Sequence, residues 1–215
     1  MLRFLCFIFL IPIFFLSTIR GYTDNHLPAP YNQISPLPFD PQGWFANGEQ
    51  LESLLKSRKV KIIIEVGSWL GLSTRHMASR LPSGGKLYAV DHWLGSIEHQ
   101  TRPEFSELLP HLYEQFLSNV IHAQLTDVII PIRMDSRSAA DYLKSVSPDL
   151  IYIDAGHDTA SVYADLTTWF PYVQGHGVLC GDDWAWDSVR AAVNHFAFEH
   201  NLKVESSGFF WRLVE

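Results

Sequence analysis

Acidic side chains stand at two points of the sequence where an apolar run of strand length ends. Asp154 follows residues 150–153, and Asp182 and Asp183 follow the run that ends at Cys180. If these runs form neighbouring parallel strands, their carboxylates converge at one edge of a pocket, where Mg²⁺ prefers such ligands. We therefore predict a metal site formed by Asp154, Asp182 and Asp183. In the alternative, Asp154 caps the next helix and the Asp pair are loop acids.

Residues beside these acids could handle a substrate hydroxyl. His157 stands three residues after Asp154, and an imidazole with an ordinary pKa of about 6.5 can act as a general base. We predict His157 as the catalytic residue; the competing interpretation is a solvent-facing loop histidine. Trp184 and Trp186 either wall an apolar acceptor pocket or belong to the core.

A second group of residues has the spacing of a nucleoside site. Glu65, Gly67 and Gly71 stand at the end of the apolar run 61–66 and just after it, and glycines there let the backbone approach a ligand closely. The phosphate-binding pattern G-x-G-x-x-G is absent from this stretch, and Glu65 would repel a pyrophosphate but attract an ammonium group. Asp91 ends the next apolar run, where an acid can accept hydrogen bonds from both ribose hydroxyls.

An alternating order of strands and helices would bring these residues together. Apolar runs of strand length alternate with helical segments, which include a long amphipathic stretch at 105–120; the runs lie at 61–66, 86–91, 128–133, 150–154 and 177–180. Strands that are apolar on both faces imply a mainly parallel sheet covered on both sides. Two final strands, at 203–207 and 209–214, are joined by a tight turn and must be antiparallel. We predict an α/β three-layer sandwich with a mainly parallel seven-stranded sheet that ends in an antiparallel hairpin.

Four short motifs carry a resemblance to a known family. They are Glu65-x-Gly67-x-x-x-Gly71, Val90-Asp91-His92-Trp93-x-Gly95, Ile153-Asp154-x-x-His157 and Gly177-Val-Leu-x-Gly-Asp182-Asp183. With them, residues 50–214 resemble class I S-adenosylmethionine-dependent methyltransferases. The resemblance is greatest to the small-molecule O-methyltransferase group that includes macrocin O-methyltransferase and the cephalosporin-biosynthesis methyltransferase.

The resemblance implies a Rossmann-like sheet, S-adenosylmethionine as cofactor and methylation of an oxygen on a small molecule or sugar. Glu65, Gly67 and Gly71 would line the methionine part of the cofactor, and Asp91 would hold the ribose. Asp135 and Ser136 would lie beside the adenine. The resembling enzymes use acids at the positions of the predicted metal site to hold Mg²⁺, which can lower the pKa of the acceptor hydroxyl and orient its oxygen.

Length and charge limit the other function classes. The chain has 215 residues and a formal net charge of −7, which suits one folded domain and a small-molecule partner. No nucleic-acid partner is expected, because such affinity comes from clustered Lys and Arg. A nucleotide-dependent oxidoreductase is a weaker alternative, since its glycine pattern is missing. A non-catalytic binding module of the same fold stays open, as does an oligomeric state.

The first residues form a hydrophobic leader. Arg3 precedes an apolar run from Phe4 to Leu16, which is shorter than a membrane span and near the length of a signal-peptide core. A signal peptide, an uncleaved anchor and an upstream extension all remain open for residues 1–21. We predict a Pro-rich linker at 22–43 and the methyltransferase domain at 44–215. The leader would hold the protein at a membrane with the domain in the cytosol, where the cofactor is made; the alternative is export.

Overall fold

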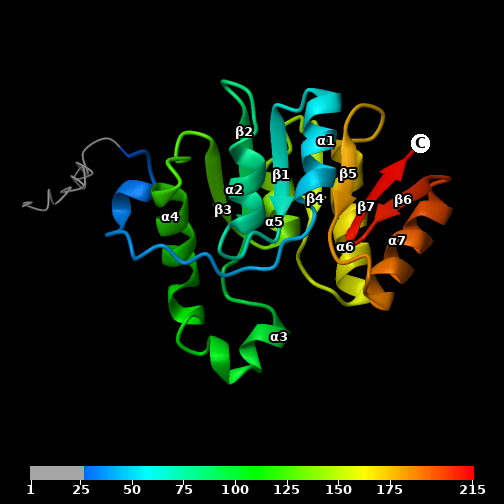
Figure 1. Ribbon diagram of the computed structural model, residues 1–215. Helices are drawn as coiled ribbons and strands as arrows, with labels where there is room; N and C mark the ends of the chain where they lie inside the picture. The colour runs from blue at the N-terminus through cyan, green and yellow to red at the C-terminus, as the bar shows by residue number, and fades with distance from the viewer. Residues whose placement is uncertain (1–26) are drawn as a thin grey trace, which may run out of the picture.

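The computed structural model describes residues 27–215, without the side chains of residues 97 and 98, and it contains one seven-stranded sheet (Figure 1). The hydrophobic leader predicted at 1–21 lies outside the described residues. The strand order is β3-β2-β1-β4-β5-β7-β6. The strands are β1 Ile62–Val66, β2 Lys86–Asp91, β3 Ile129–Arg133, β4 Leu150–Ile153, β5 Val178–Gly181, β6 Lys203–Ser207 and β7 Phe210–Val214. The first five are parallel and β7 is antiparallel to both neighbours, so the predicted fold is confirmed.

Helices cover both faces of the sheet, which explains why the parallel strands are apolar on both sides. On one face lie α1 Gly48–Arg58, α2 Leu72–Ala78 and α4 Leu112–His122. On the other lie α5 Ser136–Tyr142, α6 Thr159–Trp169 and α7 Asp187–Glu199. Ile63 packs into the first layer and Ile64 into the second, and neither side chain is exposed. The alternation of side chains along a strand therefore supplies both cores from one apolar run.

The segment before α4 is more irregular than the sequence pattern predicted. Two short elements, α3 Ile97–Gln100 and η3 Pro103–Phe105, precede the amphipathic stretch predicted at 105–120. Within that stretch a further short turn, η4 Leu109–His111, comes first, and the regular helix starts only at Leu112. Pro103 and Pro110 lie in the first turns of η3 and η4. Proline has no backbone N–H, so it is tolerated at the start of a helix but not inside one. The prolines therefore divide the stretch.

The strand order places a crevice above β1 and β4. From β1 the chain crosses to β2 and β3 on one side, whereas β4 and β5 lie on the other. Ligands of open α/β sheets bind where the order reverses, beyond the carboxyl ends of the strands. The turn after β1 and the loops after β2, β4 and β5 therefore frame the expected site.

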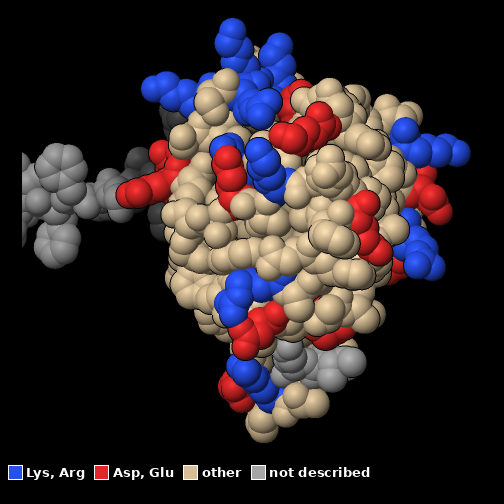
Figure 2. All heavy atoms as spheres, turned by 90° about the vertical axis from the view of Figure 1, so that its right-hand side faces the viewer, with Lys and Arg blue, Asp and Glu red and all other residues tan. Residues whose placement is uncertain are grey.

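Strand β6 is the exposed edge of the sheet. Its residues Lys203 and Glu205 are charged, and the Arg212 guanidinium on β7 forms an ion pair with Glu205. Figure 2 shows the side of the molecule that carries these strands: basic and acidic side chains lie near one another, with uncharged surface between them. Charged residues on an edge strand discourage pairing with the sheet of another molecule.

The linker predicted at 22–43 is described from residue 27 onward, where it contains the short 3-10 helix η2 Tyr31–Gln33, and residues 27–47 pack against the domain. Tyr31 is buried, and its hydroxyl donates a hydrogen bond to the Ile129 carbonyl at 2.9 Å. The Asp40 amide donates to Asn119 Oδ1 at 3.0 Å, and Asn119 Nδ2 donates to the Asp40 carbonyl at 2.9 Å. We call residues 27–47 the strap. Within residues 27–215, no helix is long and apolar enough to cross a membrane.

Candidate active site

Two adjoining cavities open at the carboxyl ends of the strands. The first, of about 750 Å³, is called the α5 cavity; its lining includes Asp91, Asp135, Ser136 and Asp165. The second, of about 520 Å³, is called the β5 cavity; its lining includes Trp44, Asp182, Asp183, Trp186 and Phe209. Both are also lined by Gly67, Trp69, His99, Asp154, Ala155 and His157. The cavities therefore meet beside the predicted acidic cluster.

The turn after β1 brings the backbone against the end of β4. Gly67 has a φ of 92°, and a Cβ at this residue would lie 2.0 Å from the Asp154 carbonyl oxygen. Gly71 has a φ of 78°, and a Cβ there would lie 2.9 Å from the Phe116 ring. Only glycine combines such a conformation with so close an approach. Gly67 lines both cavities, whereas Gly71 forms the end of the turn.

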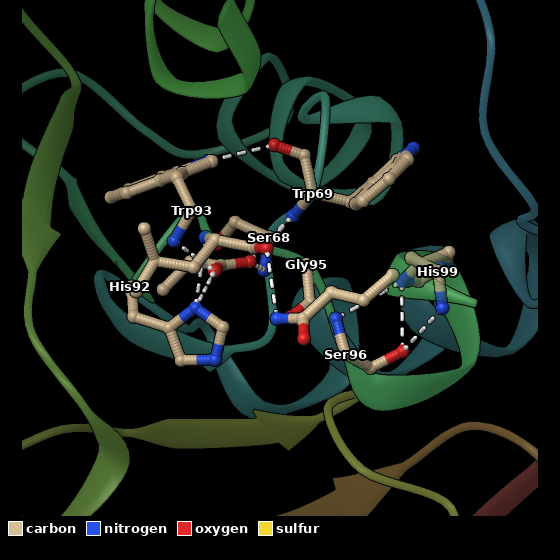
Figure 3. Close-up of polar contacts among 10 residues, drawn as sticks. Ser68, Trp69, His92, Trp93, Gly95, Ser96 and His99 are labelled. Atoms are coloured by element: carbon tan, nitrogen blue, oxygen red, sulfur yellow. Dashed lines mark hydrogen bonds and ion pairs between the residues drawn. The ribbon is translucent and has the colours of Figure 1, made fainter. Parts of the chain in front are cut away.

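Asp91 joins this turn to the loop after β2. Its Oδ2 accepts hydrogen bonds from the backbone N–H groups of Ser68 at 3.0 Å and Trp69 at 2.9 Å, and its Oδ1 accepts from the Trp93 N–H at 2.7 Å. Trp93 Nε1 also donates to the Trp69 carbonyl at 2.8 Å (Figure 3). The Asp91 side chain remains 15% exposed and lines the α5 cavity. It therefore fixes the two loops that frame the cavity while facing it.

Glu65 lies beneath the turn and lines neither cavity, which differs from its expected place beside the cofactor. The side chain is fully buried, and its carboxylate accepts hydrogen bonds from the hydroxyls of Ser68 at 2.9 Å, Ser73 at 2.5 Å and Thr74. Burial raises the pKa of Glu65 to about 7, although the three hydroxyls oppose this shift. Glu65 thus connects the end of β1 to the start of α2.

The start of α5 forms another part of the α5 cavity. Asp135 is exposed and caps the helix by accepting a hydrogen bond from the Ser138 N–H at 3.0 Å. Ser136 Oγ accepts a hydrogen bond from Trp169 Nε1 at 2.8 Å and donates one to Asp165 Oδ1 at 2.5 Å. Asp165 is buried on α6, and nothing in the sequence pattern marked it, because an acid in a helix interior has no local signature.

Three polar side chains meet where the cavities join. Asp154, His157 and Asp183 each offer a ligand atom, and these atoms all lie within 4.8 Å of one another. His157 Nε2 is 2.9 Å from Asp183 Oδ2, and the Trp186 ring stacks on the imidazole at 4.8 Å between centroids. Burial raises the pKa of Asp154 well above its usual range, and the nearby carboxylates of Asp182 and Asp183 raise it further. The site is therefore rich in acceptors and short of cations.

Asp182 lies next to this group but has other partners. Its Oδ2 accepts a hydrogen bond from the Tyr152 hydroxyl at 2.9 Å, and its Oδ1 accepts one from the backbone N–H of Asp183 at 2.6 Å. Asn47 Nδ2, at the end of the strap, donates to the same Tyr152 oxygen at 3.0 Å. Asp183 has a φ of 61°, a conformation that non-glycine residues rarely adopt. Asp182, which was predicted as a metal ligand, therefore fixes the backbone of Asp183 instead. The third side chain of the cluster is His157.

Aromatic side chains form the rim of the β5 cavity. The His99 ring stacks on Trp69 at 4.2 Å and on Trp44 at 5.9 Å between centroids. Trp44, Trp186 and Phe209 are exposed by 60%, 44% and 45%, although large apolar side chains usually gain by burial. Trp186 lines the cavity, whereas Trp184 packs against the core. This rim offers apolar contact area to a ligand in the β5 cavity.

Comparison with known proteins identifies a family. Residues 64–184, more than half of the chain, match the family described as a methyltransferase domain. No curated protein matches the sequence.

Similar folds occur in solved structures. An O-methyltransferase from Bacillus cereus, in complex with SAH, is 18% identical with a TM-score of 0.61, over 81% of this chain and 83% of that one. A putative O-methyltransferase from Klebsiella pneumoniae is 20% identical with a TM-score of 0.62, over 87% and 82%. The O-methyltransferase of tomaymycin synthesis from Streptomyces achromogenes, in complex with SAM, is 17% identical with a TM-score of 0.55, over 83% of each chain.

Proposed function

The chain belongs to the methyltransferase domain family, and from this premise we propose that it transfers a methyl group from S-adenosylmethionine to an oxygen of a small molecule. Two neighbours of the same fold are crystallised with the cofactor or its demethylated product, which supports the choice of donor. The resemblance of the motifs to the macrocin O-methyltransferase group supports a small molecule or sugar as acceptor.

The observation that carries the proposal is the junction of the two cavities. The cofactor would occupy the α5 cavity, with its ribose at Asp91 and its adenine beside Asp135 and Ser136. The acceptor would occupy the β5 cavity, against the aromatic rim. Methyl transfer is an in-line displacement, so the main task of the protein is to align donor and acceptor. Gly67 and His157 line both cavities, at the place where the two ligands must meet.

His157 is the proposed base. Its Nε2 lies 2.9 Å from Asp183 Oδ2, so the Asp183 carboxylate can stabilise the protonated imidazole that forms when His157 takes a proton. Asp183 and the stacked Trp186 ring then fix the orientation of the imidazole. The base would take the proton of the acceptor hydroxyl as its oxygen bonds to the methyl carbon and the sulfonium–methyl bond breaks, which would leave S-adenosylhomocysteine.

A divalent cation is the second way to activate the acceptor. Asp154, His157 and Asp183 would hold it, because two carboxylates and an imidazole are a donor set that Mn²⁺ or Mg²⁺ can use with added water. When bound, the cation lowers the pKa of an acceptor hydroxyl. The raised pKa of Asp154 fits a site that gains from positive charge. Asp182 would support this set through the backbone of Asp183.

Calorimetric titration of the full chain with S-adenosylhomocysteine tests the proposal first. We expect saturable binding, since the α5 cavity of about 750 Å³ is lined by Asp91, Asp135 and Ser136. Undetectable binding to folded protein at millimolar ligand would refute the methyltransferase proposal and favour the non-catalytic binding module. Methyl transfer with and without excess chelator then separates the two modes of activation. Full activity in chelator would leave His157 as a metal-free base.

We make a separate proposal, from the leader, about where in the cell the protein is located. The apolar run from Phe4 to Leu16 would keep the protein at a membrane, with the folded domain on the cytosolic side where its cofactor is made. Protease added to intact cells should leave the domain uncut, and protease added after permeabilisation should digest it. Digestion in intact cells would show that the domain is exported.

A further inference from the structure

The hydroxyl of Ser136 is the centre of a short chain of hydrogen bonds in the wall of the α5 cavity. Trp169 Nε1 donates to Ser136 Oγ, and Ser136 Oγ donates to Asp165 Oδ1. A serine hydroxyl has one hydrogen and two acceptor positions. Because Asp165 takes that hydrogen, Ser136 can offer a ligand only its remaining acceptor position.

Asp165 is also limited to accepting hydrogen bonds. It lines the cavity from α6, and it is only 7% exposed. Burial raises its pKa to about 6, while the Ser136 hydrogen bond opposes this shift. At pH 8 the side chain is therefore a carboxylate without a hydrogen to donate. The side chains of Ser136 and Asp165 therefore present only acceptors to the cavity.

We propose that this wall selects the nucleobase of the cofactor by its exocyclic amine, with Asp165 as the positioning residue that fixes Ser136 as an acceptor. The inference rests on the proposed function, which places the base in the α5 cavity. The amino group of adenine is a donor and would pair with the wall. A deaminated base carries a carbonyl oxygen at the same position, so that oxygen would face the Ser136 and Asp165 acceptors without a hydrogen between them. Binding sites whose buried polar groups would be left unpaired discriminate against such a ligand.

Asp165→Asn keeps the shape of the side chain but replaces one acceptor oxygen with an NH₂ group, which donates hydrogen bonds. If the amide nitrogen faces Ser136, it donates to Oγ and releases the serine hydrogen toward the cavity. If the amide oxygen faces Ser136, the nitrogen takes the position of the second carboxylate oxygen. In both orientations a donor enters a pair of side chains that had offered only acceptors. A role limited to joining α5 and α6 would instead change the affinity of every ligand alike.

The test is calorimetry at pH 8 on the full chain with two ligands, S-adenosylhomocysteine and its deaminated analogue S-inosylhomocysteine. We expect the wild type to favour the adenosyl ligand roughly tenfold or more. Asp165→Asn should lower this ratio by roughly tenfold. Asp141→Asn, an exposed acid on α5, is the matched control and should keep the ratio. Ser136→Ala removes the acceptor itself and should also lower it.

Each outcome decides the inference. A lowered ratio in Asp165→Asn with an unchanged ratio in Asp141→Asn supports it. An equal loss of affinity for both ligands, or a wild type without preference, overturns it and leaves the proposed function standing. If the wild type binds neither ligand, the proposed function fails and the inference fails with it. If Asp165→Asn does not fold, Ser136→Ala decides, and an unchanged ratio there overturns the inference.

Discussion

Asp91 allows a quantitative test of how the cavity is held together. Its two oxygens accept backbone hydrogen bonds from Ser68, Trp69 and Trp93, so the substitution Asp91→Asn must act on the fold as well as on the ligand. An asparagine keeps one acceptor oxygen and places an NH₂ group where the other stood. At least one backbone N–H then faces a donor.

The expected loss follows from these contacts. One charge-assisted hydrogen bond contributes about 1.5–3 kcal/mol, and the partial exposure of Asp91 lets water recover part of it. We therefore expect the free energy of unfolding to fall by about 2 kcal/mol, which lowers Tm by about 4–8 °C for a fold of this size. The affinity for S-adenosylhomocysteine should fall by roughly tenfold or more, because the ribose loses a carboxylate and the loops lose their link.

Urea unfolding gives the first quantity, and calorimetry with S-adenosylhomocysteine gives the second. Asp141→Asn serves as control, since it removes the same charge from an exposed position on α5. A variant at position 91 with weakened ligand binding and an unchanged free energy of unfolding would refute the proposed link between the loops. Unchanged binding would refute the place of Asp91 in the cofactor site.

Four further predictions concern the same region. Gly67→Ala should unfold the turn or abolish S-adenosylhomocysteine binding, because its Cβ would meet the Asp154 carbonyl oxygen at 2.0 Å; circular dichroism and calorimetry would show this, and a folded variant with normal binding would contradict it. Relative to Asp165→Asn, the free energy of unfolding of the wild type should fall by about 2 kcal/mol between pH 4 and pH 7. Burial raises the native pKa of Asp165 to about 6, so the protonated native state is favoured at low pH and this contribution is lost as the proton leaves; parallel pH curves for the two proteins would contradict the assignment. His157→Ala should lower methyl transfer by roughly 10²–10⁴-fold, with a smaller loss at high pH where solvent can take the proton; an equal loss at every pH would argue against His157 as base. Asp183→Asn should weaken Mn²⁺ or Mg²⁺ binding in a metal titration and leave S-adenosylhomocysteine affinity nearly unchanged; intact metal binding would exclude Asp183 as a ligand.

The sheet could be predicted from the sequence because each strand carries its own signal. The apolar runs that became β1, β4 and β5 are almost wholly buried, and those of β2 and β3 are partly buried. Gly67 and Gly71 follow the first run with the φ angles that the turn needs. Those signals are local. The acidic residues could likewise be placed at strand ends, which gave the approximate location of the cluster.

The partners of these acids could not be predicted, because they depend on side-chain direction and on distant segments. Asp182 and Asp183 are adjacent in sequence, yet one pairs with the Tyr152 hydroxyl and the other with His157. Asp165 meets Ser136 only because α6 lies beside α5. The strap was expected to be extended from its prolines, but its attachment to Asn119 spans 79 residues and has no local pattern.

The strap also determines how much of the chain is needed for an intact β5 cavity. Residues 43–46 form part of the wall of the β5 cavity, and Asn47 reaches Asp182 through the Tyr152 hydroxyl. A chain cut at residue 43 would keep every strand and helix that covers the sheet. It would lose the Asp40–Asn119 hydrogen bonds that hold this wall in place. One wall of the β5 cavity thus belongs to the stretch of chain that follows the leader in the sequence, so movement of that stretch would widen the cavity while the sheet stayed intact.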